Sequence, residues 1–412
     1  MILALLVINS EEVGGIEGLK TALPQGSLDF FPSLESDTSL TETLTITGAQ
    51  FLAFFGFIWW ASWYPGAEPG GGGYIAQRML AAKDENHAIG ATFFFNIMHY
   101  ALRPWPWILV ALASLIIFPD VASIQEAFPN IPQDKLGHDL AYSAMLTKLP
   151  SGLLGLVLAS LIAAYMSTIS THLNWGSSYM VNDFYKQQIK KNASEKELVL
   201  VGRISTIALM IFSALFALYL QNAKQLFDII IMFGAGTGLI FILRWFWWRI
   251  NAWSEISAMI VSGIVSLLFS SEAISTALFG NEGMMPNWAK FPMVVFITTV
   301  VWLLVTFITK PEKAKVLQSF YEKTQPGGPG WSKIIQEALK ENIILKEKEN
   351  PWSVPSGILA MLLGCVLIYS CLFTTGYWIY GAYKIAMVTS ILAAVSGLLL
   401  VKVWKKIRVD IL

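Results

Sequence analysis

Long apolar stretches separated by short polar segments dominate this chain. A membrane-spanning helix needs about 20 predominantly apolar residues to cross ~30 Å of hydrocarbon. Stretches of that length occur at residues 47–64, 91–118, 151–173, 198–220, 226–248, 253–270, 291–309, 355–374 and 377–401. The pattern therefore predicts about nine transmembrane helices.

The composition supports the same class of protein. Hydrophobic residues make up 55% of the chain and charged residues 14%, and the mean hydropathy is +0.56. These values are typical of an all-α polytopic membrane protein and exclude soluble classes. The formal net charge of zero gives no reason to expect a nucleic-acid partner. Cys365 and Cys371 lie in one apolar run and provide neither a disulfide framework nor a metal-binding set.

The distribution of lysine and arginine among the polar segments predicts the orientation. When the spans are assigned alternately, most basic residues fall on one side, which the positive-inside rule identifies as the cytoplasm. The segment at 310–353 is then a cytoplasmic loop and the acidic segment at 10–46 an extracytoplasmic one. We expect a multi-pass protein of the cell membrane, the bacterial inner membrane in particular, with the lipid bilayer as its surroundings.

Residues 1–9 are too short to span a bilayer. Met1–Ile8 is apolar, but it has neither the basic leader nor the cleavage site of a secretory signal. We expect this segment to be the stub of a truncated transmembrane helix.

A second irregularity follows the span at 47–64. The segment Tyr64–Tyr74 contains a run of helix-breaking residues that includes Pro65, Pro69, Gly70, Gly71, Gly72 and Gly73. Two interpretations stay open. The segment is a flexible cytoplasmic turn, or it is a break in a helix whose freed backbone groups face a substrate cavity. The depth of Glu68 in the membrane distinguishes them. A further glycine-rich stretch, GAGTG at 234–238, indicates close helix packing or a hinge.

The strongest local signal is AAYMSTISTHLN at residues 163–174. Ser167 and Thr168 lie three and four residues after Ala164, so on a helix both hydroxyls lie on the face where the Ala164 carbonyl emerges. Three uncharged oxygens in one place suit a small alkali cation within a membrane. The alternative is that these hydroxyls bond back to the preceding turn, as serine and threonine often do in membrane helices.

Arg103 lies near the middle of the span at 91–118, close to His99 and beside Pro104 and Pro106. An ionisable residue at that depth is a functional hypothesis by default, and an arginine there is able to hold a carboxylate. The alternative is an arginine that reaches the outer interface or pairs with another helix. We include His99 and Arg103, with Tyr64 and Glu68, in a predicted solute site.

The stretch AAYMSTISTHLNWGSSYMVNDFYK at 163–186 resembles the signature helix of the sodium:solute symporter family. A second stretch, GYIAQRMLAAKDE at 73–85, is similar to the run that follows the broken sixth core helix of that family, with Gln77 and Arg78 carrying the match. WFWWRIN at 245–251 and the order of the spans agree with both. By this resemblance the sodium ligands fall on Ala164, Ser167 and Thr168, with the helix-ending Asp-x-Tyr at Asp183–Tyr185.

The resemblance also implies a fold and a function. The fold is a partial leucine-transporter type: a second inverted repeat at 47–248, followed by appended C-terminal helices at 249–412. The function is symport of a small organic solute with sodium as coupling ion, without an organic cofactor or a further metal. Family members hold their ligands between two repeats, so we expect this chain to be an incomplete copy, with a separately encoded N-terminal half as a possible partner.

Two alternatives to transport stay open. One is a membrane solute sensor or subunit, and the other is a non-functional remnant. An enzyme is excluded, because the sequence has no nucleophile elbow, phosphate loop, metal pair or Cys/His constellation.

Overall fold

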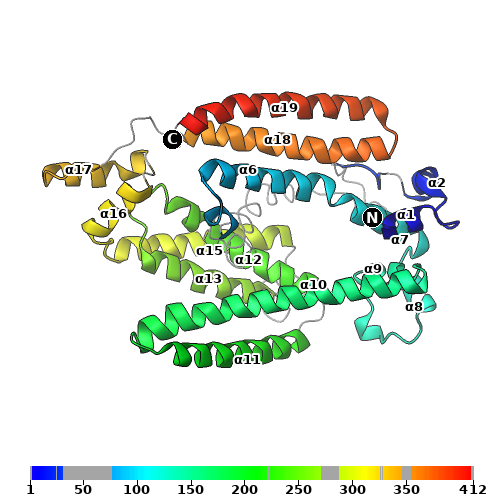
Figure 1. Ribbon diagram of the computed structural model, residues 1–412, viewed down its shortest axis with the longest axis horizontal. Helices are drawn as coiled ribbons and strands as arrows, with labels where there is room; N and C mark the ends of the chain where they lie inside the picture. Colours follow the sequence, from blue (N-terminus) through cyan, green and yellow to red (C-terminus); the bar gives the residue numbers. More distant parts are fainter. Residues whose placement is uncertain are drawn as a thin grey trace. The chain divides into compact units, whose positions relative to one another are not determined.

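The computed structural model of the protein describes residues 2–24, 26–30, 77–219, 223–270, 287–324, 326, 328–345 and 354–409. Within these ranges the regular elements are helices, and no β-strand is present (Figure 1). The prediction of an all-α polytopic membrane protein is therefore confirmed.

Eight helices in the described ranges are long and apolar enough to cross a membrane. They span Asn86–Ile117, Ser151–Ile189, Glu195–Leu218, Leu226–Leu243, Ala252–Ser270, Lys290–Ile308, Val354–Ile379 and Tyr383–Trp404. Each overlaps a predicted span, although Ser151–Ile189 extends well past the predicted end at residue 173. The ninth predicted span, 47–64, lies outside the described residues.

The chain divides into two compact units, and the first consists of Met1–Leu23 and Pro106–Leu226. Its main feature is a helical hairpin formed by α10 (Ser151–Ser178), the π-helix η4 (Tyr179–Ile189) and α11 (Glu195–Tyr219), which lie side by side in Figure 1. The Ser177 hydroxyl donates to the Gly202 carbonyl across the hairpin at 2.8 Å. A Cβ at Gly176 would lie 3.0 Å from Leu209. Small residues thus let the two helices approach closely.

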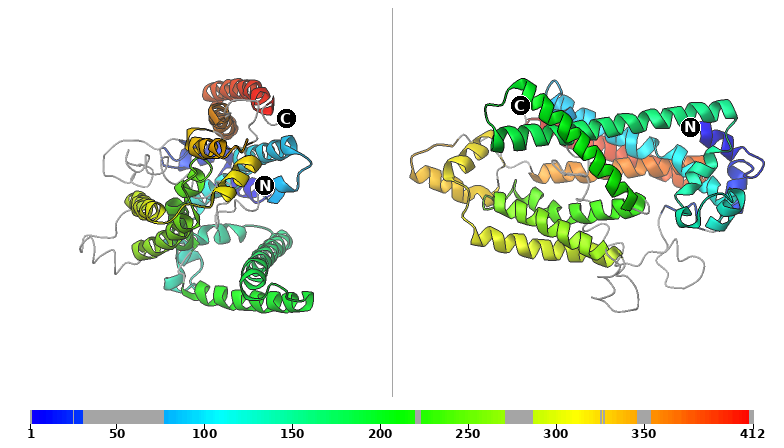
Figure 2. Two further views of the ribbon diagram at one scale, coloured as in Figure 1. Left: turned by 90° about the vertical axis from the view of Figure 1, so that its left-hand side faces the viewer. Right: turned by 90° about the horizontal axis from the view of Figure 1, so that it is seen from below.

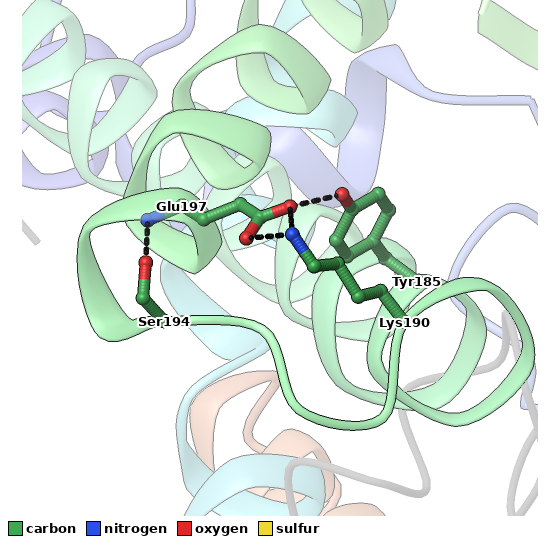
Figure 3. A network of polar contacts seen from close by, with 4 residues as sticks. All are labelled: Tyr185, Lys190, Ser194 and Glu197. Atoms are coloured by element: carbon green, nitrogen blue, oxygen red, sulfur yellow. Dashed lines mark hydrogen bonds and ion pairs between the residues drawn. The ribbon is translucent and has the colours of Figure 1, made fainter.

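A polar network closes this hairpin at its turn (Figure 3). The Tyr185 hydroxyl donates to Glu197 Oε1 at 2.6 Å, and Lys190 Nζ lies 2.8 Å from Glu197 Oε2. The hydrogen bond to Glu197 raises the pKa of Lys190 above its usual value. The family resemblance predicts a helix end at Asp183–Tyr185, and this is wrong for the structure. The helix continues to Ile189, because its π-helical hydrogen bonds persist and the Lys190 amide still donates to the Tyr185 carbonyl.

The rest of the first unit is built from shorter helices. These are α1 (Ile2–Ile8), α2 (Gly15–Ala22), α7 (Trp105–Ile117), α8 (Val121–Ala127), the 3₁₀ turn η3 (Gln133–Lys135) and α9 (Leu140–Leu146). The Lys148 ammonium lies 2.7 Å from the Glu12 carboxylate. The hydrogen bond between them lowers the pKa of Glu12 and ties the segment between α1 and α2 to the one that follows α9.

The second unit consists of Pro24–Trp105 and Phe227–Leu412. In it, α18 (Val354–Ile379) and α19 (Tyr383–Val409) form a second hairpin, which Figures 1 and 2 show as two antiparallel helices. Its turn contains Gly381 with a positive φ of 73°. The helix α6 (Glu85–Asn96) and the π-helix η2 (Ile97–Leu102) pack against this hairpin. The ring centroids of Phe93 and Trp404 are 6.3 Å apart.

Three further helices of this unit meet along a seam of small polar residues. They are α12 (Ala223–Leu243), α13 (Ala252–Ser270) and α15 (Asn287–Ile308). The Ser262 hydroxyl on α13 donates to the Phe233 carbonyl on α12 at 2.8 Å. A Cβ at Gly236 would lie 2.1 Å from the Ser262 oxygen and 2.9 Å from the Thr298 hydroxyl on α15. The GAGTG stretch is therefore a site of close helix packing.

The loop at 310–353 is partly helical, with α16 (Ala314–Thr324), the 3₁₀ turn η5 (Pro329–Trp331) and α17 (Ser332–Lys340). Trp331 is 2% exposed, and its indole N–H donates to the Trp245 carbonyl after α12 at 2.9 Å. The Trp248 amide in turn donates to the Gly330 carbonyl at 3.3 Å. This loop is consequently fixed to the end of α12 by main-chain and side-chain bonds.

We predict that Gly236→Ala destabilises the protein by about 1–3 kcal/mol, because the added methyl group forces α12 away from α13 and α15. Gly155→Ala in α10 is the matched control, since its Cβ would meet none of the described residues within 4 Å. Thermal unfolding of the two variants in detergent measures the difference. Equal stability of both variants would contradict close packing of α12 against α13 and α15 at Gly236.

Candidate functional site

The helix α10 carries a polar stripe along one face. The stripe consists of Ala164, Ser167, Thr168, Thr171 and His172, whose successive spacings are three, one, three and one residues, and all five are exposed. At about 100° per residue this spacing keeps them on one side of the helix. The sequence-based prediction that Ala164 and Thr168 share a face agrees with their contact: the Thr168 hydroxyl donates to the Ala164 carbonyl at 2.9 Å.

The same pattern continues along the stripe. The Thr171 hydroxyl donates to the Ser167 carbonyl at 2.8 Å, and His172 Nδ1 lies 2.9 Å from the Thr168 carbonyl. These are the back bonds that the alternative interpretation of the motif predicts. They leave lone pairs on the hydroxyl and carbonyl oxygens, and a separation of 2.9 Å allows two oxygens to contact one small cation. The sodium assignment of Ala164, Ser167 and Thr168 stays a prediction.

The helix α11 packs on another side of α10. Ser177, which bonds to Gly202 of α11, follows Ala164 by thirteen residues, so it lies about 140° around the helix from Ala164. The polar stripe therefore points away from α11. In hydrocarbon such a face gains nothing from lipid, so it requires water or further protein beside it.

The second candidate pair, His99 and Arg103, comes together on one helix. Arg103 Nη1 lies 3.0 Å from His99 Nδ1 at the end of η2. A guanidinium only donates, so Nδ1 accepts and the proton of a neutral His99 is on Nε2. His99 also stacks on Phe95, with ring centroids 4.9 Å apart, and meets Tyr100 edge to face at 4.8 Å. The imidazole is thus held by aromatic neighbours while it positions the arginine.

The π-helical geometry of this segment is a feature that the sequence reasoning missed. The Arg103 amide donates to the Met98 carbonyl, five residues back, at 3.0 Å. The prolines explain the wider turn: Pro104 has no amide hydrogen for the Tyr100 carbonyl, and its ring would collide with that carbonyl in a regular α-helix. Single π-helical turns occur frequently at functional sites. The Pro104 and Pro106 pair was the available signal.

The remaining candidate residues lie outside the described part of the chain. These are Tyr64, Pro65, Glu68, Pro69, Gly70, Gly71, Gly72 and Gly73. Among the described residues, no group of three histidine, cysteine or acidic side chains lies close enough to hold a metal ion. A cation on α10 would therefore rest on neutral oxygen atoms.

Comparison with known proteins bears on these features. A family model described as the sodium:solute symporter family matches residues 1–262. Sodium/myo-inositol cotransporter 2 of Rattus norvegicus is 32% identical over 209 residues, which cover 47% of this chain and 30% of the relative. Sodium/glucose cotransporter 4 of Danio rerio is 27% identical over 309 residues, which cover 69% of this chain and 44% of the relative.

A bacterial relative matches a shorter region. The high-affinity proline transporter PutP of Bacillus subtilis is 31% identical over 150 residues, which cover 35% of this chain and 31% of the relative. The chain thus aligns with less than half the length of each of these three transporters. The family model, in contrast, covers well over half of the chain. The protein therefore belongs to the sodium:solute symporter family.

Proposed function

We propose that this chain takes part in sodium-coupled symport of a small organic solute across the cell membrane by alternating access. The observation that carries the proposal is the row of exposed oxygen-bearing residues, Ala164, Ser167 and Thr168, on one face of a membrane-spanning helix. Family membership and the sodium cotransporters among its relatives support the same function. The related proteins that we compared are transporters, which agrees with the prediction that the chain is not an enzyme.

In this proposal the sodium ion binds to the α10 stripe. The Ala164 carbonyl and the Ser167 and Thr168 hydroxyls supply neutral oxygen ligands, so the site carries no permanent charge when it is empty. This matters within the bilayer, where a buried charge without a partner is costly. The ion adds one positive charge, and the solute then moves with it down the sodium gradient.

The polar stripe also requires further protein or water beside it. Ser167, Thr168, Thr171 and His172 are exposed, although they lie within the span Ser151–Ile189. We therefore place a cavity along this face, completed by membrane segments additional to those described. A separately encoded N-terminal half of the transporter is one source of such segments.

Arg103 is the proposed solute contact. Its guanidinium has five N–H donors, and one of them is held by His99. The planar fork of donors suits a carboxylate or another group with paired acceptor oxygens. A small solute with such a group is consequently the substrate class that we propose.

Uptake into membrane vesicles tests the function. Right-side-out vesicles are prepared from host cells with the gene intact and deleted, so that any partner of the chain is retained. Labelled amino acids, sugars and polyols are supplied under an inward sodium gradient or an equal potassium gradient. We expect deletion to abolish sodium-dependent uptake of at least one solute. Unchanged uptake of every solute would overturn the proposal.

Replacing Ser167 and Thr168 together by alanine should raise the sodium concentration for half-maximal uptake by about tenfold or more, because two of the three proposed ligands are lost. Kinetics of uptake against sodium concentration measure this. Thr206→Ala on α11 is the matched control, since Thr206 makes the same back bond, to the Gly202 carbonyl at 2.9 Å. Equal sodium dependence in the double variant and the control would refute the site.

Arg103→Gln should raise the KM for the solute about tenfold or more while the sodium dependence changes little, because the guanidinium contacts the solute and not the ion. Arg103→Lys, which retains the charge, should lose less. Uptake at varied solute concentration, with the amount of chain in the membrane as reference, separates these effects. Poor membrane insertion of both variants, or an unchanged KM, would assign Arg103 a structural role.

A further inference from the structure

Four aromatic side chains of the second unit contact the phenyl ring of Phe30, which lies in the segment after α2. The Phe30 ring centroid is 4.9 Å from those of Phe373 and Tyr377 on α18. It is 5.9 Å from that of Trp105 at the start of α7 and 6.1 Å from that of Tyr380 in the turn after α18. Aromatic rings attract one another at such distances. We call these five residues the aromatic box.

A glycine on α18 makes room for the box. A Cβ at Gly376 would overlap Cη2 of Trp105 and Cζ of Phe30, so both rings lie directly against the helix backbone. Trp105 is 3% exposed and Tyr380 is 7% exposed, and their rings meet edge to face at 5.8 Å. The Trp105 indole N–H has no hydrogen-bond partner among the described residues. Ring contacts in the box are therefore what holds the Trp105 side chain.

Trp105 lies two residues after Arg103, where the main chain has few hydrogen bonds to hold it. Pro104 and Pro106 flank Trp105, and neither has an amide hydrogen to donate to the preceding turn. The last amide before them, that of Arg103, makes the wide π-helical bond to the Met98 carbonyl. The direction of the chain at Arg103 therefore depends on what holds Trp105.

The orientation of the helices agrees with one location for the box. Gly364 and Gly376 of α18 are twelve residues apart, and so are their neighbours Phe93 and Trp105. The chain from α6 to Trp105 consequently runs in the same direction as α18, and Trp105 lies beside the end of α18. Because the loop at 310–353 before α18 is assigned to the cytoplasm, this end is extracytoplasmic. The segment that contains Phe30 has the same assignment.

We propose that the aromatic box anchors the π-helical break and that Phe30, through Trp105, is a positioning residue for Arg103. With Trp105 held in the box, the chain across Pro104 keeps one direction, and the Arg103 guanidinium beside His99 keeps one place. A binding group works only while its supporting residues hold it within about 0.5 Å of the productive position. For the solute, this role rests on the proposed function, in which Arg103 is the solute contact.

Hydrogen–deuterium exchange of the full chain in lipid nanodiscs tests the anchor independently of transport. Phe30→Ala should speed the exchange of the amides at 97–105 about tenfold or more, because the ring contacts that hold Trp105 are lost. Exchange at 231–240 of α12 should stay unchanged, which separates local release from general destabilisation. Phe94→Ala on α6 is the matched control, since that ring is 64% exposed, and it should change neither region.

Uptake into membrane vesicles tests the positioning. Phe30→Ala should raise the KM for the solute about fivefold or more, while the sodium concentration for half-maximal uptake stays the same. Phe30→Leu keeps an apolar side chain in the box and should lose less. Gly376→Ala should act like Phe30→Ala, because its methyl group collides with two rings of the box. Gly357→Ala is its control, since that Cβ would meet none of the described residues within 4 Å.

The two measurements separate the possible outcomes. Unchanged exchange at 97–105 in Phe30→Ala would overturn the anchor. A KM no higher than that of Phe94→Ala, with lower uptake that only follows the amount of chain in the membrane, would refute the positioning role. Faster exchange at 97–105 in a protein whose deletion leaves uptake unaffected would support the anchor and count against the proposed function instead.

Discussion

The hydrocarbon of the bilayer offers no hydrogen-bond partners, so each polar group within a span needs a partner in the protein or in a water-filled space. Several hydroxyl groups of the described helices meet this requirement within their own helix. Thr168, Thr171 and Thr206 donate to carbonyls four residues back. Where helices approach closely, the partner comes from the neighbouring helix, as between Ser262 and Phe233. The buried Thr306 hydroxyl likewise lies 2.7 Å from the Ser254 hydroxyl. Serine and threonine hydroxyls therefore form hydrogen bonds both within one helix and between neighbouring helices.

The two proposed transport sites depart from this rule in different ways. The stripe on α10 pairs the Thr168 and Thr171 hydroxyls within the helix but exposes a row of polar atoms, which suits an ion that enters and leaves. The η2 segment departs from regular helix geometry at two prolines, and there His99 holds Arg103 within the span. In both places neutral or internally paired groups keep the cost of an empty site low. A permanent unpaired charge at the same depth would be far more costly.

The sequence predicted much of this fold because a transmembrane helix is a local pattern. Apolar length alone located the eight described spans, and the spacing of Ala164 and Thr168 was enough to predict that they share one face of the helix. The π-helices at Ile97–Leu102 and Tyr179–Ile189 were missed. Their hydrogen bonds join residues five apart in the sequence, and the apolar pattern does not distinguish these from the four-residue bonds of an α-helix. The docking of Trp331 on Trp245 was missed as well, because it joins residues 86 positions apart. Tyr64 and Glu68 lie outside the described residues, and their assignment stays a prediction.

Cysteine accessibility in intact membranes tests whether water and ions reach the polar face of α10. In a chain with Cys365 and Cys371 replaced by alanine, single cysteines are placed at Ser167, Thr168, Ile162 and Met166. Ile162 and Met166 are exposed apolar residues on the opposite side of α10. A charged thiol reagent should modify the cysteines at 167 and 168, sodium but not potassium should slow the reaction, and the cysteines at 162 and 166 should stay unmodified. Equal reactivity at all four positions, or no effect of sodium, would contradict an ion-accessible site on this helix.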